Sequence, residues 1–219
     1  MELLVRVQLP VATPMKKIAQ GLQYKVYDIG NDRILKKTTN NAEMAVKLIS
    51  WGELNIKKLI REAIDIRKKS IEGLLNLGNI DPKILGNPKF LQNLSYEQDK
   101  VISVEDYMAS HTVEENKRII DKYIENIFET WKFGFADIVY NFTINNGVNL
   151  EGKVILIDLG ELSFSKEEVG ESIKNKKWLT RHSYKTLKCK DKELEQYFKE
   201  TMEEMVTLSS LDKYWSQSQ

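Results

Sequence analysis

The stretch "VILIDLGELSF", residues 154–164, places an acidic residue at the end of a short apolar run. The four aliphatic residues from Val154 to Ile157 are typical of a strand that is buried on both faces. The run stops at Asp158, and the next three residues are Leu, Gly and Glu. A carboxylate at the edge of a hydrophobic core is costly unless a partner stabilises its charge. A metal ion is one such partner, and it would need further ligands from the rest of the chain.

The overall composition narrows the class of protein. A chain of 219 residues is long enough for one large domain or two small lobes. Charged residues make up 30% of the chain, and the formal net charge is +1. General nucleic-acid binding requires a clustered basic excess, so this balance argues against it.

The sequence also indicates a compartment. The single cysteine, Cys189, excludes an internal disulfide and a metal site built from several cysteines, and one unpaired thiol is typical of a reducing compartment. No apolar run reaches the length of a membrane span. The first residues, "MELLVRVQLPVATPM", lack the basic segment and apolar core of a signal peptide. We therefore expect a cytoplasmic protein that does not associate with membranes.

The first half of the chain is expected to be rich in strands. Residues 16–39 contain two alternating runs joined at "GND", a sequence typical of a turn. Residues 41–77 carry apolar side chains at helical spacing, and Gly52 is a candidate break between two helices. The segments "KFLQNL" (89–94) and "DKVISVEDYM" (99–108) then favour two more strands.

The second half is expected to be mainly helical. Thr112 and Glu115 have the spacing of a capping box at the start of a long helix that ends at Gly134. A short strand, an Asn- and Gly-containing hairpin and further helices follow. This order indicates an α+β fold with two lobes, a β-rich N-terminal lobe over residues 1–106 and a reduced helical C-terminal lobe over 107–219. Ligands favour the cleft between such lobes.

Four polar residues fall at strand ends and in loops of this layout. Lys36, rather than its neighbour Lys37, is in phase with the apolar positions of its predicted strand. Asp137 and Asn141 lie in the loop after the long helix, and Asp158 ends the buried strand. A lysine neutralises phosphate oxygens as a compact charge. Asp and Asn offer the hard oxygen ligands that Mg²⁺ prefers, and Asp137 is suited to orient or deprotonate an acceptor hydroxyl.

The order of these features resembles the protein-kinase-like fold, which includes small-molecule kinases such as aminoglycoside phosphotransferases. "QGLQYKVYDIG" resembles a shortened nucleotide-covering loop, with Gly21 and Val26 at the spacing of the middle glycine and the valine that follows the loop. "RILK" resembles the strand that carries the phosphate-binding lysine, here Lys36. "ISVEDYM", which includes Glu105 and Tyr107, resembles the strand that leads into the hinge, where backbone hydrogen bonds hold adenine.

Two later motifs continue the resemblance. "GFADIVYNF" resembles the catalytic loop, which implies Asp137 as the base and Asn141 as a metal ligand. "LIDLG" resembles the metal-binding Asp-Phe-Gly element, which implies that Asp158 binds Mg²⁺. The chain also departs from the family pattern. Asn141 lies four rather than five residues after Asp137, and Ala19 and Tyr24 occupy the places of the outer loop glycines.

The roles of three glutamates remain open in the sequence. A kinase-like site also requires a helix glutamate that pairs with the lysine. Glu53 and Glu62 are the candidates, and we predict Glu62 because its helix is the more regular. Glu161 directly follows Gly160 and is a surface charge, a second metal ligand or the partner of a basic residue.

The leading hypothesis is an ATP- and Mg²⁺-dependent phosphotransferase that acts on a hydroxyl acceptor, either a small molecule or a protein side chain. A catalytically inactive pseudokinase that binds nucleotide is a second hypothesis, motivated by the departures from the family pattern. Transfer of AMP on the same fold is a third, because the sequence does not discriminate it from phosphoryl transfer. In a fourth, the resemblance is accidental and the chain is a structural α+β protein.

Overall fold

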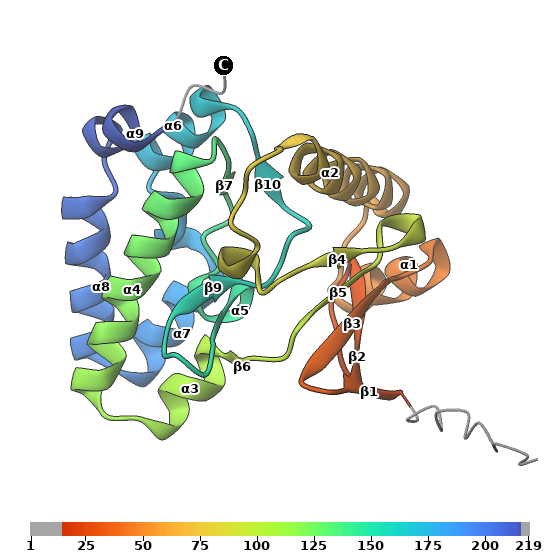
Figure 1. Cartoon of the computed structure of the whole chain (residues 1–219), viewed down its shortest axis with the longest axis horizontal. Coiled ribbons are helices and arrows are strands. Elements are labelled where there is room, and N and C mark those ends of the chain that lie inside the picture. The colour runs from red at the N-terminus through yellow and green to blue at the C-terminus, as the bar shows by residue number, and fades with distance from the viewer. Residues whose placement is uncertain (1–14, 216–219) are drawn as a thin grey trace, which may run out of the picture.

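The chain folds as a mixed α+β protein with antiparallel sheets, as predicted. The computed structural model describes residues 15–215, except for the side chains of residues 188–190. Figure 1 shows a five-stranded sheet with two helices on one side of the molecule and a group of helices on the other side. Short strands lie between these two parts.

The first five strands form one antiparallel sheet. They are β1 (Lys16–Gln20), β2 (Tyr24–Gly30), β3 (Arg33–Thr38), β4 (Lys89–Phe90) and β5 (Tyr96–Asp99). Their order in the sheet is β1-β2-β3-β5-β4. Asn31 and Asp32 form the turn between β2 and β3, and each has a φ of 53°, which is the backbone geometry of a tight hairpin. The antiparallel sheet predicted over residues 16–39 is therefore confirmed.

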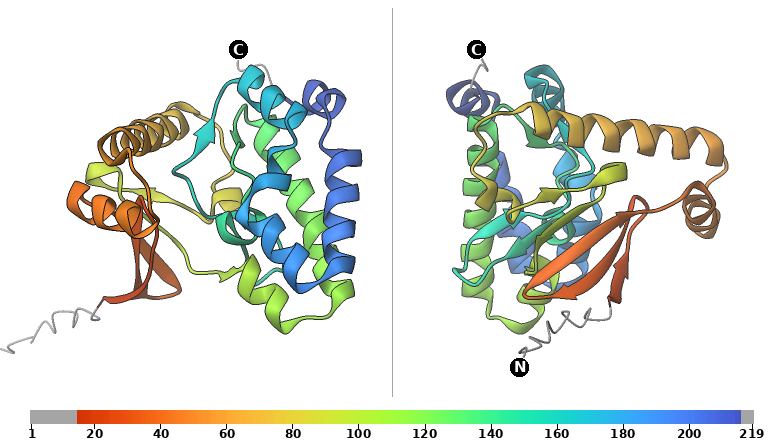
Figure 2. Two further views of the ribbon diagram at one scale, coloured as in Figure 1. Left: turned by 180° about the vertical axis from the view of Figure 1, so that it is seen from behind. Right: turned by 45° about the vertical axis from the view of Figure 1, so that its right-hand side comes forward.

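Two helices follow β3, as predicted. α1 (Asn41–Ser50) starts at a capping box formed by Asn40 and Glu43. Gly52, with a φ of 79°, separates it from α2 (Ile56–Asn76). Both views of Figure 2 show α2 lying across one side of the five-stranded sheet. The stripe that α2 buries includes one charged residue and consists of Ala63, Arg67, Ser70, Ile71 and Leu74.

Short strands connect this sheet to the helical side. β6 (Ile102–Ser103), β8 (Asn146–Val148) and β9 (Val154–Leu156) form a three-stranded sheet, and β7 (Ala136–Asp137) pairs with β10 (Leu162–Ser163). Every residue of β9 is buried, so the predicted strand buried on both faces is confirmed. The predicted hairpin is the β8–β9 pair.

Two predicted strands are largely wrong. "KFLQNL" pairs only through β4, because Asn93 and Leu94 adopt positive φ values of 59° and 58° and end the extended backbone. "DKVISVEDYM" contains only the end of β5 and the two residues of β6 before helix α3 (Val104–Ser110) begins. The Ser103 side chain accepts a hydrogen bond from the Asp106 N–H, and this N-cap favours a helix over a longer strand.

The other helices pack together on the second side of the molecule. The capping box of Thr112 and Glu115 starts the long helix α4, as predicted.

The predicted lobe boundary between residues 106 and 107 lies inside α3. Within residues 15–215, no helix combines the length and apolar character needed to cross a membrane. The helices are α4 (Val113–Lys132), α5 (Phe142–Asn145), α6 (Lys166–Lys174), α7 (His182–Lys190), α8 (Lys192–Met205) and α9 (Leu208–Tyr214), and 3₁₀ turns cover Pro82–Leu85 (η1), Gln92–Leu94 (η2) and Lys177–Thr180 (η3).

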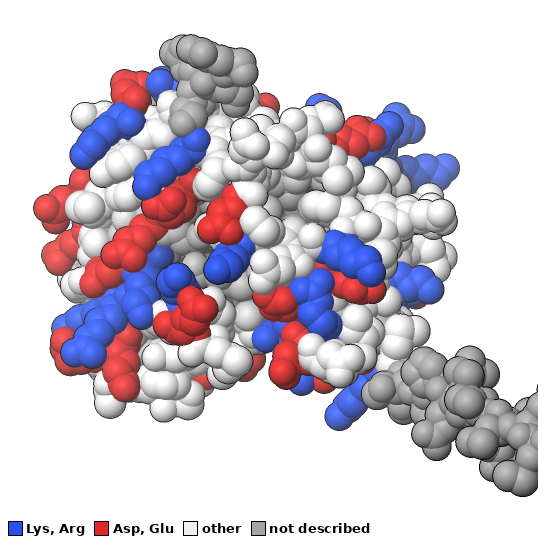
Figure 3. Space-filling model, viewed as in Figure 1, with Lys and Arg blue, Asp and Glu red and all other residues white. Residues whose placement is uncertain are grey.

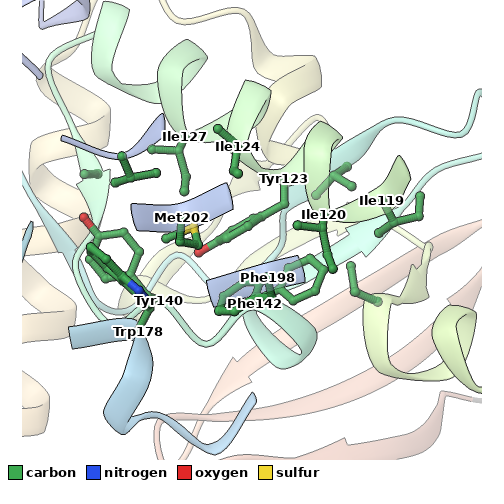
Figure 4. Close-up of a cluster of buried hydrophobic side chains, with 14 of the residues drawn as sticks. Ile119, Ile120, Tyr123, Ile124, Ile127, Tyr140, Phe142, Trp178, Phe198 and Met202 are labelled. Carbon is green, nitrogen blue, oxygen red and sulfur yellow. The ribbon is translucent and has the colours of Figure 1, made fainter. Parts of the chain in front are cut away.

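The larger hydrophobic core surrounds α4. Figure 4 shows α4 side chains meeting aromatic residues of α5 and α8. The ring centroid of Tyr123 lies 4.7 Å from that of Phe142, which lies 5.4 Å from that of Phe198. Trp131 is also fully buried here. This packing supports the loop that carries Asp137, because that loop starts where α4 ends.

A second core joins the five-stranded sheet and α2 to the segment that follows β9. Tyr24 and Tyr96 from the sheet pack with three apolar residues around Asp158, namely Leu156, Leu159 and Leu162. Because these leucines are buried against the sheet, the acidic residues between them are held in a fixed place relative to β3 and β5.

Gly147 is a position where the fold tolerates no side chain. A Cβ atom there would lie 2.3 Å from a methyl carbon of Val101 and 3.0 Å from the Ile102 carbonyl oxygen. Gly147→Ala should therefore lower the free energy of unfolding by about 1–3 kcal/mol, because β6 and β8 must separate. Urea denaturation measures this change. Gly78→Ala is the control, since a Cβ there meets no atom within 4 Å, and equal stability of the two variants would contradict the expectation.

Candidate functional site

The predicted site residues Lys36 and Asp158 meet between β3 and the end of β9. The Lys36 Nζ donates a hydrogen bond of 2.5 Å to the carbonyl oxygen of Ile157, the residue before Asp158. The backbone N–H groups of Ile157 and Asp158 donate to the carbonyl oxygen of Asn145, at 2.8 and 3.1 Å. Lys36 is only 7% exposed. Asp158 is therefore held beside a buried cation by three backbone contacts.

Asp137 lies next to the same group. Asp137 is the last residue of β7 and pairs with Leu162 of β10. One carboxylate oxygen accepts from the Val139 N–H at 2.8 Å, and the other accepts from the Asn145 side-chain amide at 3.1 Å. Asn145 thus links Asp137 to Asp158, by its side chain to the first and its carbonyl oxygen to the second.

The charges of this cluster change one another's ionisation. The pKa of Asp137 is raised to about 6, because burial and the charge of Asp158 outweigh the hydrogen bonds from Val139 and Asn145 that lower it. Burial lowers the pKa of Lys36, and the nearby charge of Asp158 opposes that effect.

Glu161 belongs to this cluster as well. Its pKa is raised to about 7, first by burial and then by the charges of Asp158 and Asp137, whereas Arg181 lowers it. The half-buried carboxylate also lies 3.5 Å from the Gln23 side-chain nitrogen. The printed side-chain partner of Glu161 is thus an amide, and the nearest basic influence on its charge is that of Arg181.

A second asparagine, Asn145, lies four residues after the predicted metal ligand Asn141 and belongs to the cluster. Asn141 precedes α5, and its side-chain oxygen is buried without a hydrogen-bond partner. The side chain that reaches Asp137 is instead that of Asn145. The register of the β8–β9 hairpin, in which Asn146 faces Leu156, places Asn145 opposite the residues before and at Asp158. Asn145 could have been found in the sequence by pairing residues outward from the turn of the predicted hairpin, which sets it opposite the end of the aliphatic strand.

The β1–β2 loop reaches the site through Gln23 rather than Gly21. Gly21 has room for a side chain, since its nearest neighbour to a built Cβ lies at 3.7 Å. The close approach is at Gly160, where a Cβ would lie 2.4 Å from the Gln23 side-chain oxygen. That buried oxygen has no hydrogen-bond partner. Val26, as predicted, lies beside the lysine strand, because it pairs with Lys36 in the β2–β3 register.

The prediction that Glu62 pairs with Lys36 is wrong. Glu62 is exposed on α2, 3.7 Å from Lys58 of the same helix, and Glu53 is exposed as well. One residue of a helix is a rotation of about 100°, so the position after Glu62 begins the buried stripe and Glu62 itself points away. The charged residue that α2 buries is Arg67, whose guanidinium donates to the Gln23 carbonyl oxygen at 2.9 Å.

Glu105 and Tyr107 lie in helix α3 rather than in an extended hinge. The ring of Tyr107 stacks on that of His111, with centroids 3.6 Å apart, and Glu105 is half-buried in the first turn. The backbone here is helical rather than extended, so these residues do not form the strand that the resemblance implied. The extended link between the two sides of the molecule is Lys100 and Val101, before β6.

A cavity of about 900 Å³ lies away from this cluster. It is lined by the β2–β3 turn, η1, the link after β5, α4 and the β8–β9 turn, and its lining includes Lys83 and Lys122 but neither Lys36 nor Asp158. Its charges are of both signs, and Figure 3 shows the same mixture over this side of the molecule. The buried Gln23 side chain, by contrast, packs against Gly160, the second residue after Asp158.

The cluster suits a small hard cation bound together with phosphate. Among the described residues, no three carboxylate, histidine or cysteine side chains lie close enough to hold a metal alone. Mg²⁺ commonly takes only one or two protein carboxylates and completes its shell with phosphates and water. Asp158, the Asn145 amide and the unpartnered Gln23 oxygen are ligands of that kind.

The sequence matches no protein-family model, and no curated protein is significantly similar to it.

Proposed function

We propose that this protein is an ATP- and Mg²⁺-dependent phosphotransferase with a two-lobed, protein-kinase-like fold. One observation carries the proposal. Lys36, Asp137, Asn145 and Asp158 come from four separate elements, and a continuous set of hydrogen bonds through Asn145 and Ile157 connects them. Their order along the chain agrees with the resemblance stated above.

Each residue has a role that follows from its chemistry. Lys36 neutralises phosphate oxygens. Asp158 and Asn145 hold Mg²⁺, which when bound neutralises charge on the transferred phosphoryl group. Asp137 accepts the proton of the acceptor hydroxyl, and a pKa of about 6 leaves it ionised at neutral pH. The acceptor is a hydroxyl of a small molecule or of a protein. Catalysis of the transfer depends mainly on positioning and electrostatics.

A nucleotide-binding pseudokinase is the second candidate. It is favoured by Arg67, because α2 buries a cation where a kinase-like site uses a glutamate. Such a protein would bind ATP and release no product. Mass spectrometry of the reaction components separates the possibilities, because phosphoryl and AMP transfer add groups of different mass and a pseudokinase adds none.

Thermal unfolding with and without ATP and Mg²⁺ tests the site. Ligand at about a hundred times its Kd stabilises the folded state by roughly 2.7 kcal/mol. We expect this shift in the natural protein and its loss in Lys36→Met, which keeps the apolar stem and removes the charge. Lys83→Ala, in the wall of the large cavity, should keep the shift.

Two results would contradict the proposal. Loss of the shift in Lys83→Ala with retention in Lys36→Met would place the nucleotide in the large cavity. No shift in the natural protein would leave a structural α+β protein.

A further inference from the structure

One tyrosine hydroxyl holds the backbone on both sides of Asp158. Tyr96 of β5 is fully buried. Its hydroxyl donates to the Ile157 carbonyl oxygen and accepts from the Leu159 N–H, both at 3.3 Å. The peptide groups before and after Asp158 are thus tied to a single side chain of the five-stranded sheet.

The same tyrosine contacts Lys36. The two residues are direct partners in the β3–β5 register, and the Lys36 Nζ lies 5.6 Å from the centroid of the Tyr96 ring. A cation at this distance is attracted to the electron-rich face of an aromatic ring. The Lys36 ammonium and the Tyr96 hydroxyl also donate to the same carbonyl oxygen, that of Ile157.

A second layer fixes the orientation of the Tyr96 ring. Tyr24 packs edge-on against it with centroids 5.3 Å apart, and the Arg67 guanidinium lies 5.7 Å from the Tyr24 ring centroid. The Tyr24 hydroxyl donates to the Leu94 carbonyl oxygen, which lies outside the Asp158 segment. Two cations therefore flank two tyrosines where the family resemblance would require a lysine and a glutamate.

We propose that Tyr96 is the positioning residue that holds Lys36 and Asp158 in one geometry, in place of a helix carboxylate. This inference rests on the proposed function, because it concerns how the nucleotide and metal ligands are placed. The ring stabilises the ammonium of Lys36, and the hydroxyl fixes the peptide groups that direct the Asp158 side chain. Burial lowers the pKa of Lys36 and Asp158 opposes that effect, in agreement with a lysine that lacks a directly bonded carboxylate.

The test compares Tyr96→Phe with Tyr24→Phe. Each variant keeps its ring and loses one buried hydroxyl, but only the first loses contacts to the residues flanking Asp158. The Mg²⁺ concentration that gives half of the ATP-induced thermal shift is measured at fixed ATP. We expect Tyr96→Phe to raise it at least tenfold and Tyr24→Phe to leave it within about twofold of the natural protein. The melting temperature without ligand shows that both variants fold.

Three results would overturn the inference. An unchanged Mg²⁺ requirement in Tyr96→Phe would show that its hydroxyl does not position Asp158. Equal increases in both variants would mean that the tyrosine pair acts only on general stability. If the natural protein itself shows no response to ATP and Mg²⁺, the proposed function fails first and Tyr96 has no such ligands to position.

Discussion

Asp158→Asn is expected to reduce Mg²⁺-dependent ATP turnover by at least about 10²-fold while the protein stays folded. The amide has the shape of the carboxylate but no charge, so it is a weak ligand for a hard divalent cation. The backbone N–H of residue 158 donates to Asn145, and the side-chain oxygen that accepts from the Gly160 N–H has a counterpart in asparagine. Hydrolysis of ATP with water as the acceptor, followed as released phosphate, measures the loss without knowledge of the natural acceptor.

Asp65→Asn is the matched control for this change. Asp65 is exposed on α2, so the same loss of charge there should leave turnover and its Mg²⁺ dependence unchanged. Unfolding of Asp158→Asn would assign the carboxylate a structural role. Full activity in that variant would remove Asp158 from the metal site.

Asp137→Asn is expected to retain ATP binding and to lose about 10²–10⁴-fold in turnover, the usual contribution of a general base. In the natural protein the rate should rise with pH through about 6, because burial raises the pKa of Asp137 to that value and only the ionised form accepts a proton. The variant should turn over slowly at every pH and should lack this rise with pH. Retained turnover would place the base elsewhere.

The same group predicts an opposite trend in stability. Its pKa is higher in the folded protein, about 6, than its ordinary value of 3.8, so between these values the folded state binds more protons than the unfolded state. The stabilisation from Asp137 is therefore fully present below about pH 4 and is lost as the pH rises through about 6. Urea denaturation from pH 4 to 7 should show this loss in the natural protein and a weaker one in Asp137→Asn.

Glu161 adds a separate part of this trend. Its pKa is raised from 4.5 to about 7, so Glu161→Gln should remove the loss of stability between about pH 6 and 7 and also part of the loss between about pH 4.5 and 6. If neither variant changes the dependence on pH, the two carboxylates are not as buried as the structure places them.

The elements nearest the site could be predicted from the sequence because local patterns specify them. An unbroken aliphatic run predicted the buried strand β9 with Asp158 at its end, and alternation with apolar residues predicted the inward face of Lys36 on β3. Capping residues predicted where α4 begins. In each case the signal lies within a few residues, and solvent exclusion alone decides which side chain faces the core.

Only the tertiary structure decided which polar side chains share the site. Asn145 joined the site because the register of β8 on β9 sets which residue faces Asp158. Arg67 replaced Glu62 because the rotational phase of α2 on the sheet sets which side chain is buried. No local pattern in the sequence pointed to Tyr96. Its hydroxyl contacts Ile157, which lies 61 positions further along the chain, and the Lys36 contact to the same residue spans 121 positions. Strand register and helix phase depend on the packing of all elements together, so a local pattern leaves them undetermined.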